Sequence, residues 1–206
     1  MKFIDRETET EMMRDWDGMA KPYKNYSERS PYYDEFIRRS GLEPGDTVFD
    51  MGCGSGTLCV PLAEDGYTVF GADFSEKMLD SVRTVIDERG LEGLTLRRLA
   101  FLNDWEEEDI PVCDLVFASR CMDNLDPAVV LPKLTAHAKK RVCITIHVSR
   151  EDGILHGSSY KGQDSIEYEK ACFDAVLDMG YYPRVDYMDC MFSAEKGGWV
   201  FISWDV

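Results

Sequence analysis

A glycine-rich segment, VFDMGCGSGTL at residues 48–58, limits the possible folds of this chain more than any other feature. An apolar run ending at Asp50 predicts a short buried strand, and the residues after the glycines predict a helix. Glycines at such a junction let the backbone adopt positive φ and let a ligand approach closely, while the helix presents free N–H groups. The segment therefore predicts a ligand site at the carboxyl end of a parallel strand. The three glycines are Gly52, Gly54 and Gly56.

The same alternation of strands and helices continues to the end of the chain. Strands are predicted over residues 47–51, 67–72, 94–99, 114–118, 141–148, 184–191 and 199–205, and helices over 57–64, from Ser75, from Pro127 and over 165–180. Pro132 is expected to kink or restart the third of these helices. Only the link SAEKGG joins the last two strands, which favours an antiparallel hairpin. We therefore predict an α/β fold with a Rossmann-like, doubly wound sheet of seven strands, mostly parallel with a C-terminal antiparallel hairpin.

The chain has 206 residues, and a typical domain has about 150. We predict a single domain over 1–206, with an N-terminal helical lid or extension over 1–40 and a ligand-binding core over 41–206. The extension precedes the first strand, so the sheet does not need it for closure.

Two groups of aromatic residues lie in this extension. Tyr32, Tyr33 and Phe36 recur at helical spacing and are expected to dock on the sheet. Trp16, Tyr23 and Tyr26 lie in a stretch interrupted by glycine and proline, WDGMAKPYKNY. We predict that this second group forms a lid lining the active site. A purely packing role is the alternative.

The charge balance excludes several classes of partner. The chain has 23 Lys and Arg against 39 Asp and Glu, a formal net charge of −16. That field repels phosphate backbones and anionic membranes. No apolar run reaches the roughly 20 residues of a transmembrane helix, and the charged start does not resemble a signal peptide. The seven cysteines are scattered without a C-x-x-C pair, so we expect a reduced, cytoplasmic protein without a structural zinc ion.

Two carboxylates accompany the glycine loop, and the loop lacks the dinucleotide fingerprint. G-x-G-x-x-G would need a glycine where Thr57 stands. Asp50, near the end of the first strand, would repel a pyrophosphate but suits a cationic amino group. Asp73 closes the second strand, where a carboxylate can accept hydrogen bonds from both ribose hydroxyls. The alternative is a tight turn in which Asp73 caps the next helix.

On these residues the chain resembles the class I S-adenosylmethionine-dependent methyltransferases. VFDMGCGSG matches their first motif and VFGADFSEKML their second, acidic one, while RRLAFLNDW, DLVFASRCMDNL and KRVCITIHV fall where later motifs fall. The resemblance covers about residues 30–206. It implies S-adenosylmethionine as cofactor, S-adenosylhomocysteine as product and methyl transfer as the reaction, but says little about the acceptor.

The resemblance also implies roles for individual residues. The three glycines would underlie the methionine part of the cofactor, with Asp50 holding the loop and reaching the amino group, and Asp73 would bind the ribose. Phe74 would lie against adenine, Asp104 would accept from the adenine amino group with Trp105 packed beside it, and Ser119 would face the methionine side. For Asp104 and Trp105 the alternative is a polar loop residue and a core anchor.

Candidate catalytic residues are fewer, because an in-line methyl transfer depends mainly on positioning. A general base is needed only if the acceptor loses a proton. His147, near the end of the fifth strand, is the first candidate, and a histidine hydrogen-bonded to a loop is the alternative; His156 and His137 are weaker candidates. Arg120, which with Asp123 follows the fourth strand, either binds an anionic substrate or pairs with a neighbouring carboxylate.

The acceptor is predicted to be a small molecule. The D/N-P-P-Y/F run of enzymes that methylate exocyclic base amines is absent after the fourth strand, and the charge argues against nucleic acid. An Asp-Asn pair after the fifth strand is also absent, so no catalytic metal is expected. A protein or RNA acceptor, a non-catalytic cofactor-binding regulator and an NAD-dependent oxidoreductase are the alternatives. The partners expected are a small-molecule substrate and, at most, a second copy of the chain, as monomer or homodimer, with no membrane.

Overall fold

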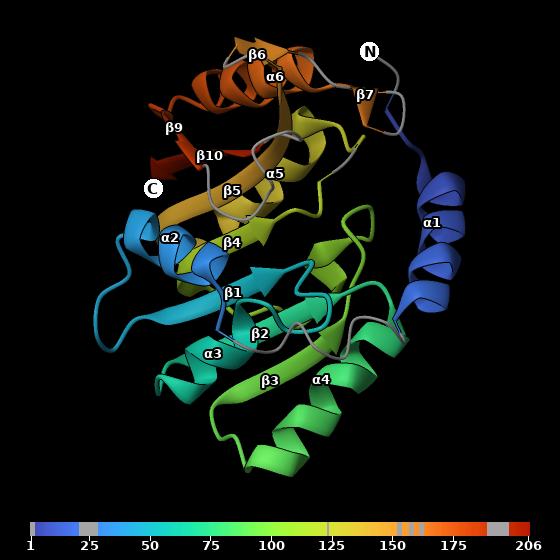
Figure 1. Cartoon of the computed structure of the whole chain (residues 1–206), viewed down its shortest axis with the longest axis vertical. Helices are drawn as coiled ribbons and strands as arrows, with labels where there is room; N and C mark the ends of the chain where they lie inside the picture. The colour runs from blue at the N-terminus through green and yellow to red at the C-terminus, as the bar shows by residue number, and fades with distance from the viewer. Residues whose placement is uncertain are drawn as a thin grey trace.

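The computed structural model describes residues 3–20, 29–122, 124–151, 154–156, 159–160, 163–188 and 198–206. A mixed sheet forms the centre of this part of the chain (Figure 1). Its main path runs β3 (Leu94–Arg98), β2 (Thr68–Asp73), β1 (Thr47–Met51), β4 (Cys113–Ser119), β5 (Ala138–Glu151), β10 (Gly198–Asp205) and β9 (Arg184–Met188). Neighbours from β3 to β5 are parallel, while β10 is antiparallel to both β5 and β9. The predicted seven-stranded, mostly parallel sheet with its C-terminal antiparallel hairpin is confirmed, and the structure adds the order of its strands.

The sheet carries an addition that the sequence pattern did not indicate. β5 extends beyond the predicted end at residue 148, and its last residues pair with β6 (Ile154–His156). Two further short strands, β7 (Ser159–Tyr160) and β8 (Gln163–Asp164), pair with each other. These short strands lie between β5 and α6 (Ser165–Asp178). Strands of two or three residues are too short to show a hydrophobic periodicity, so the sequence pattern could not indicate them.

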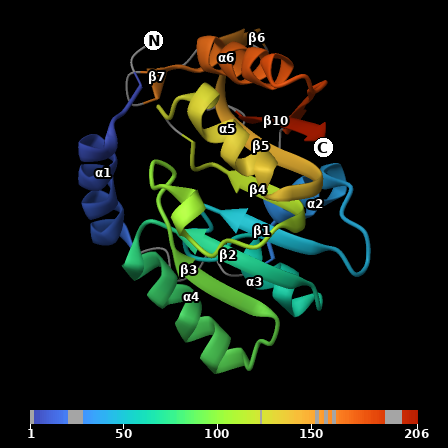
Figure 2. The ribbon, with the colours of Figure 1, turned by 180° about the vertical axis from the view of Figure 1, so that it is seen from behind.

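The central strands of the sheet, such as β1 and β4, are buried on both faces, which places helices in two layers. In β4, Leu115 and Phe117 belong to one apolar cluster and Val116 and Ala118 to the other, because successive side chains point to opposite faces. The first cluster includes α2 (Pro31–Ser40), α3 (Cys59–Glu64) and α4 (Glu76–Arg89). The second includes α5 (Pro127–Ala136) and α6 (Ser165–Asp178). α2 lies in front of the sheet in Figure 1 and α5 in front in the reverse view of Figure 2.

Local signals set most helix ends. Ser30 caps α2, its hydroxyl oxygen accepting from the backbone N–H of Tyr33 at 3.2 Å, and Gly41 ends it with φ 71°. Asp126 caps α5 in the same way, and the helix continues through Pro132 without restarting. α3 begins at Cys59 rather than at residue 57, because the backbone is still in turns there.

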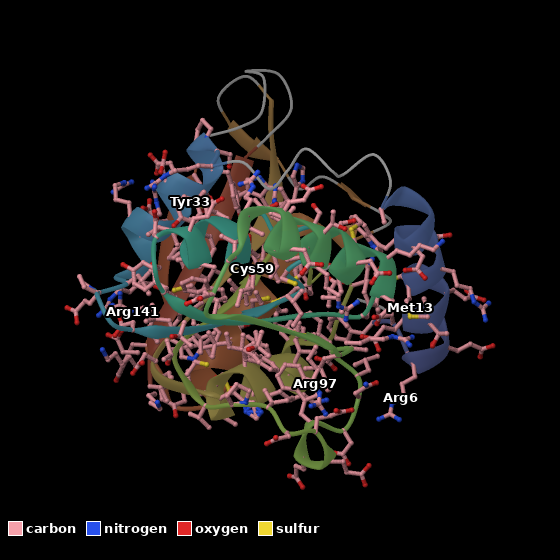
Figure 3. All side chains as sticks on the ribbon, turned by 90° about the horizontal axis from the view of Figure 1, so that it is seen from below. Arg6, Met13, Tyr33, Cys59, Arg97 and Arg141 are labelled. Carbon is pink, nitrogen blue, oxygen red and sulfur yellow. The ribbon has the colours of Figure 1, made fainter. Side chains whose placement is uncertain are left out.

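α1 (Arg6–Met19) stands apart from both layers, beyond the carboxyl ends of the parallel strands (Figures 1 and 2). Asp5 caps it, accepting from the backbone N–H of Thr8 at 2.9 Å. Figure 3 shows Arg6 and Met13 of α1 at one edge of the molecule and Tyr33 and Arg141 at the opposite edge. Within the predicted extension 1–40, therefore, α2 belongs to a packed layer and α1 is the part in a lid position. None of the described helices is long and apolar enough to cross a membrane.

Candidate functional site

A cavity of about 500 Å³ lies at the carboxyl ends of β1, β2, β4 and β5. Its volume is within the range of about 300–1,000 Å³ that small-molecule sites occupy. It lies where the strand order reverses between β1 and β4, which is the usual ligand position in open α/β sheets. Its lining includes Asp50, Gly52, Gly54, Asp73, Phe74, Ser119, Arg120, His147, Trp199 and Trp16.

The glycine loop presents bare backbone to this cavity. Gly52 has φ 73°, and a Cβ placed on it would lie 2.4 Å from the Cβ of Cys121. Gly54 has φ 55°, and a Cβ on it would meet nothing within 4 Å. Gly52 is thus required by conformation and by packing, whereas Gly54 leaves open space for a ligand. Gly56, with φ 97°, faces Val60 in α3 and does not line the cavity.

Asp50 is a buried carboxylate with one oxygen, Oδ2, that has no hydrogen-bond partner among the described residues. The residue is 2% exposed and lines the cavity. Burial raises the pKa of its carboxyl to about 7, although a hydrogen bond from the backbone of Cys59 and the charge of Arg120 act against the rise. A buried oxygen without a partner is destabilising. A cationic donor in the cavity would satisfy it and restore the charged form.

Asp73 ties the glycine loop to the end of β2. Its Oδ2 accepts from the backbone N–H of Gly54 at 2.8 Å, and its Oδ1 accepts from that of Ser75 at 2.9 Å. Burial raises the pKa of this carboxyl to about 6. Each oxygen retains a lone pair for a further donor. The cap of α4 is Ser75, whose hydroxyl accepts from the backbone N–H of Met78, so Asp73 lines the cavity without serving as that cap.

Asp104 and Trp105 do not reach the cavity, and here the sequence-based expectation differs from the structure. Asp104 caps the short helix η2 (Trp105–Glu107), accepting from the backbone N–H of Glu106 at 3.2 Å. Trp105 is 4% exposed in the apolar cluster, with its ring stacked on His137 at 5.5 Å between centroids. Burial of a large apolar ring decides this position. Phe101, earlier in the same loop, lines the cavity instead.

At the other end of the cavity, Tyr32 joins α2 to the ends of β4 and β5. Its hydroxyl is hydrogen-bonded to Ser119 Oγ at 2.6 Å and to Thr145 Oγ1 at 2.9 Å. Burial raises the pKa of Tyr32 to about 12, so the phenol is neutral. Ser119, expected at the methionine side, thus lies in a buried hydroxyl network at the cavity wall.

Arg120 lies against the ring of Tyr32, with its Cζ 4.4 Å from the ring centroid. Its backbone has φ 59°, in the left-handed region, and its backbone N–H donates to Thr145 Oγ1 at 3.1 Å. The guanidinium donates to Thr57 Oγ1 at 3.1 Å. A non-glycine residue at positive φ persists only where surrounding contacts hold it.

His147 and Trp199 face each other across β5 and β10, where they are register partners. Their rings meet edge-on, with centroids 5.2 Å apart. Burial lowers the pKa of His147, so the imidazole is neutral at neutral pH and able to accept a proton.

α1 covers the cavity with Glu9, Met12 and Trp16. Glu9 is 7% exposed and accepts from the backbone N–H of Leu102 at 3.2 Å, while burial raises the pKa of its carboxyl. Asp17 accepts from Ser75 Oγ at 2.5 Å, which joins α1 to the start of α4. Tyr23, Tyr26 and Asp123 lie outside the described residues, as does the side chain of His156.

Sequence reasoning missed several residues of the site. Thr57 and Trp199 line the cavity without belonging to a recognisable motif. In the sequence, Thr57 is notable only because it stands where the dinucleotide-binding motif G-x-G-x-x-G would have its last glycine. Trp199 could not be found, because an aromatic residue in a strand is typical of any core. Within the described residues, no group of His, Cys, Asp and Glu is arranged to hold a metal ion.

Comparisons with known proteins agree with this geometry. A family described as "Methyltransferase domain" matches residues 48–141. An uncharacterized protein of Haemophilus influenzae is 38% identical over 118 residues, which are 56% of this chain and 42% of that protein. The magnesium-protoporphyrin O-methyltransferase of Synechocystis is 47% identical over 48 residues, 23% of this chain and 21% of that protein. The chain thus spans less than half the length of these two curated relatives.

Two solved structures share the fold. Phosphoethanolamine N-methyltransferase 2 of Haemonchus contortus, in complex with S-adenosyl-L-methionine, matches with a TM-score of 0.67 and 17% identity over 92% of this chain and 57% of that one. A SAM-dependent methyltransferase of Aquifex aeolicus matches with a TM-score of 0.63 and 16% identity over 94% of this chain and 98% of that one.

Proposed function

Because the chain belongs to the class I S-adenosylmethionine-dependent methyltransferases, we propose that it transfers a methyl group from S-adenosylmethionine to a small-molecule acceptor. The observation that carries this proposal is the partnerless Oδ2 of Asp50 beside an open glycine loop. The methionine end of the cofactor has an ammonium group, and this carboxylate can accept a hydrogen bond from it. When bound, the cofactor supplies a methyl group already activated on a sulfonium.

The residues of β1 and β2 would hold the cofactor. Asp50 accepts from the ammonium group, and Asp73 accepts from the ribose hydroxyls through its remaining lone pairs. Gly54 leaves room for the methionine part over the loop. Phe74 and Phe101 supply apolar surface for the adenine ring at the same end. Neither Asp104 nor Trp105 is included, because both lie outside the cavity lining.

The remaining residues would orient the acceptor and exclude water. Holding the methyl donor and the acceptor in line contributes a large part of the rate of methyl transfer, since the effective molarities of well-oriented reactants reach about 10⁵–10⁸ M. Trp16 and Met12 on α1 line the side of the cavity that faces away from the sheet. His147 would accept a proton from an acceptor that must lose one, because burial keeps its imidazole neutral.

Several features support a small-molecule acceptor and a cytoplasmic location. The cavity is enclosed by α1 and holds about 500 Å³, which suits a cofactor and a small partner. The net charge of −16 opposes nucleic acid. Five cysteines in the core are free thiols, as a reducing compartment requires: Cys53, Cys59, Cys113, Cys143 and Cys172. A single central sheet supports one domain over the whole chain.

Two measurements test the proposal. Calorimetry should show S-adenosylhomocysteine binding with NAD failing to bind; absence of S-adenosylhomocysteine binding would contradict it. Incubation with S-adenosylmethionine and a metabolite panel should then release S-adenosylhomocysteine with at least one acceptor. Binding without release on any small molecule, protein or RNA would instead identify a non-catalytic regulator.

A further inference from the structure

Arg120 is an unusual cation in this chain. Most described arginines pair with carboxylates, as expected for a protein of net charge −16; examples are Arg29, Arg83, Arg89, Arg97, Arg141 and Arg184. Among the described residues, Arg120 has no carboxylate within ion-pair distance, and its guanidinium donates only to Thr57 Oγ1. A guanidinium has five N–H donors. Most of them therefore have no partner in the described part of the chain, on a half-buried side chain that lines the cavity.

The guanidinium is held in place before any ligand binds. One face lies 4.4 Å from the ring centroid of Tyr32, and the centroid of Trp199 is 5.9 Å away. Tyr32 is itself fixed by hydrogen bonds to Ser119 and Thr145. A cation positioned in this way loses little side-chain entropy when it binds an anion, and its planar fork matches carboxylate and phosphate oxygens.

The position of Arg120 separates it from the residues proposed to hold the ribose and the adenine of the cofactor. Asp73 and Phe74 follow β2, on one side of β1 in the sheet order. Arg120 follows β4 on the other side of β1, and its guanidinium lies beside Trp199 of β10. His147 lines this same end of the cavity. The cation, the aromatic surface and the candidate base thus surround one space beyond the methionine end of the cofactor.

We propose that this end of the cavity binds the methyl acceptor through an anionic group, a carboxylate or a phosphate, which Arg120 holds while the acceptor packs against Trp199. The proposal rests on the methyltransferase function above and adds the chemical class of the acceptor. An anion held here places the rest of the molecule between Arg120 and His147. A neutral acceptor of the same shape would leave the guanidinium without an ionic partner, and the site would discriminate against it.

Calorimetric titration of the protein saturated with S-adenosylhomocysteine tests the proposal with three probes: inorganic phosphate, benzoate and the neutral analogue benzamide. We expect at least one anion to bind and benzamide to bind at least tenfold more weakly than benzoate if the carboxylate is the preferred anion. Phosphate binding without benzoate binding would identify the anion as a phosphate. Arg120→Gln should weaken anion binding about 10- to 100-fold, and Arg120→Lys should lose less because it keeps the charge.

Matched variants keep the result interpretable. Arg83→Gln removes an exposed arginine that pairs with Glu76 and Asp80 on α4, and should leave anion binding unchanged. If Arg120→Gln fails to fold, Thr57→Val removes the hydrogen bond that orients the guanidinium and should weaken anion binding severalfold. Thermal unfolding of each variant establishes that it is folded.

Three results would overturn the proposal. The first is that neither anion binds the loaded wild-type protein, and the second is that Arg120→Gln binds anions as wild type does. The third is that Arg120→Gln weakens the binding of S-adenosylhomocysteine and leaves anion binding unchanged, which would mean that Arg120 binds the carboxylate of the cofactor. Failure of the proposed function has a different signature, because wild type then fails to bind S-adenosylhomocysteine before any anion is added. In that case, titration of the unloaded protein with the anions still tests Arg120.

Discussion

The two ends of the cavity are built in different ways. The end proposed for the cofactor comes mainly from one stretch of chain, residues 50–75, to which Phe101 is added. Within this stretch Asp73 accepts hydrogen bonds from the backbone of Gly54 and Ser75. The end proposed for the acceptor is assembled from five separate parts of the chain: Tyr32 on α2, Thr57 after the glycine loop, Arg120 after β4, His147 on β5 and Trp199 on β10. The first end depends on local geometry and the second on the packing of distant elements.

The two ends also differ in charge. Asp50 and Asp73 are buried carboxylates whose pKa values burial raises. The other end has a guanidinium, an imidazole and two aromatic rings. An acidic end suits an ammonium group and ribose hydroxyls, whereas a cationic aromatic end suits an anion. We therefore expect substitutions at one end to leave the function of the other end intact.

The largest effect is expected for His147→Ala. Loss of a general base lowers kcat by about 10²–10⁴-fold, measured as S-adenosylhomocysteine release with an acceptor from the panel. Affinity for S-adenosylhomocysteine should stay near wild type, because His147 lies at the acceptor end. A folded variant with the full rate would remove His147 from the chemistry.

Asp73→Ala tests the cofactor end. Losing charge-assisted hydrogen bonds to ribose costs about 1.5–3 kcal/mol, or roughly 10- to 150-fold in affinity for S-adenosylhomocysteine by calorimetry. Anion binding at Arg120 should not change. Asp104→Ala is the matched control, since Asp104 lies outside the cavity lining and its loss should leave that affinity unchanged. Equal affinities in the Asp73 variant and wild type would remove Asp73 from the ribose site.

The pH dependence of cofactor binding reports on Asp50. Its pKa of about 7 in the free protein means that the carboxyl is increasingly protonated below pH 7, and an ammonium ligand must then displace that proton. Affinity for S-adenosylhomocysteine should therefore fall as pH decreases through 7, approaching about tenfold per pH unit for one proton. Asp73, with a pKa of about 6, adds to the fall at lower pH.

Calorimetry in buffers of different ionisation enthalpy measures the proton released. Asp50→Asn should bind more weakly at pH 8 and show a nearly flat profile between pH 6.5 and 8. A wild-type profile that is already flat over this interval would mean that Asp50 does not receive the ammonium group.

The stabilities of two variants, Tyr32→Phe and the neighbouring Tyr33→Phe, test whether the buried hydroxyl network supports the proposed acceptor end. The hydroxyl of Tyr32 bonds to two buried hydroxyls, so its loss should lower the free energy of unfolding by about 1–3 kcal/mol in urea denaturation. The hydroxyl of Tyr33 donates to the partly exposed Asp65 at 2.8 Å, so its loss should matter less. Anion binding should weaken only in the Tyr32 variant. Equal effects in both variants would show that the buried network does not hold Arg120.

The smallest effect is expected in α1, which spans both ends as a cover. Hydrogen exchange of residues 6–19 should slow severalfold when S-adenosylhomocysteine binds, because the ligand adds contacts beneath the helix. Asp17→Ala removes the bond to Ser75 and should speed exchange, while Asp15→Ala on the exposed side should not. Unchanged protection on ligand binding would mean that α1 is a fixed wall rather than a lid.

The sequence assigned roles to most residues of the proposed cofactor end, whereas at the proposed acceptor end it gave only the separate candidates Arg120 and His147, for a physical reason. Asp50, the glycines and Asp73 are recognisable because strand, turn and helix geometry fix their relative positions within about 25 residues. The sequence left two interpretations of Trp105 open, because a tryptophan near a site and a tryptophan in a core have the same pattern along the chain; the structure places it in the core. The rings of Phe49 and His137, which surround it, come from elements on either side of it in the chain.

The succession of strands and helices along the chain, the doubly wound sheet and the position of the glycine loop followed from hydrophobic periodicity and from the conformational demands of glycine, which act over a few residues. The register that sets His147 opposite Trp199, the stacking of Arg120 on Tyr32 and the placement of α1 over the cavity did not. Each of these joins residues between about 50 and 90 positions apart, or a helix to strands that it does not precede directly. Contacts at such separations are selected by the packing of the whole core, so only the folded chain brings the residues of the proposed acceptor end together.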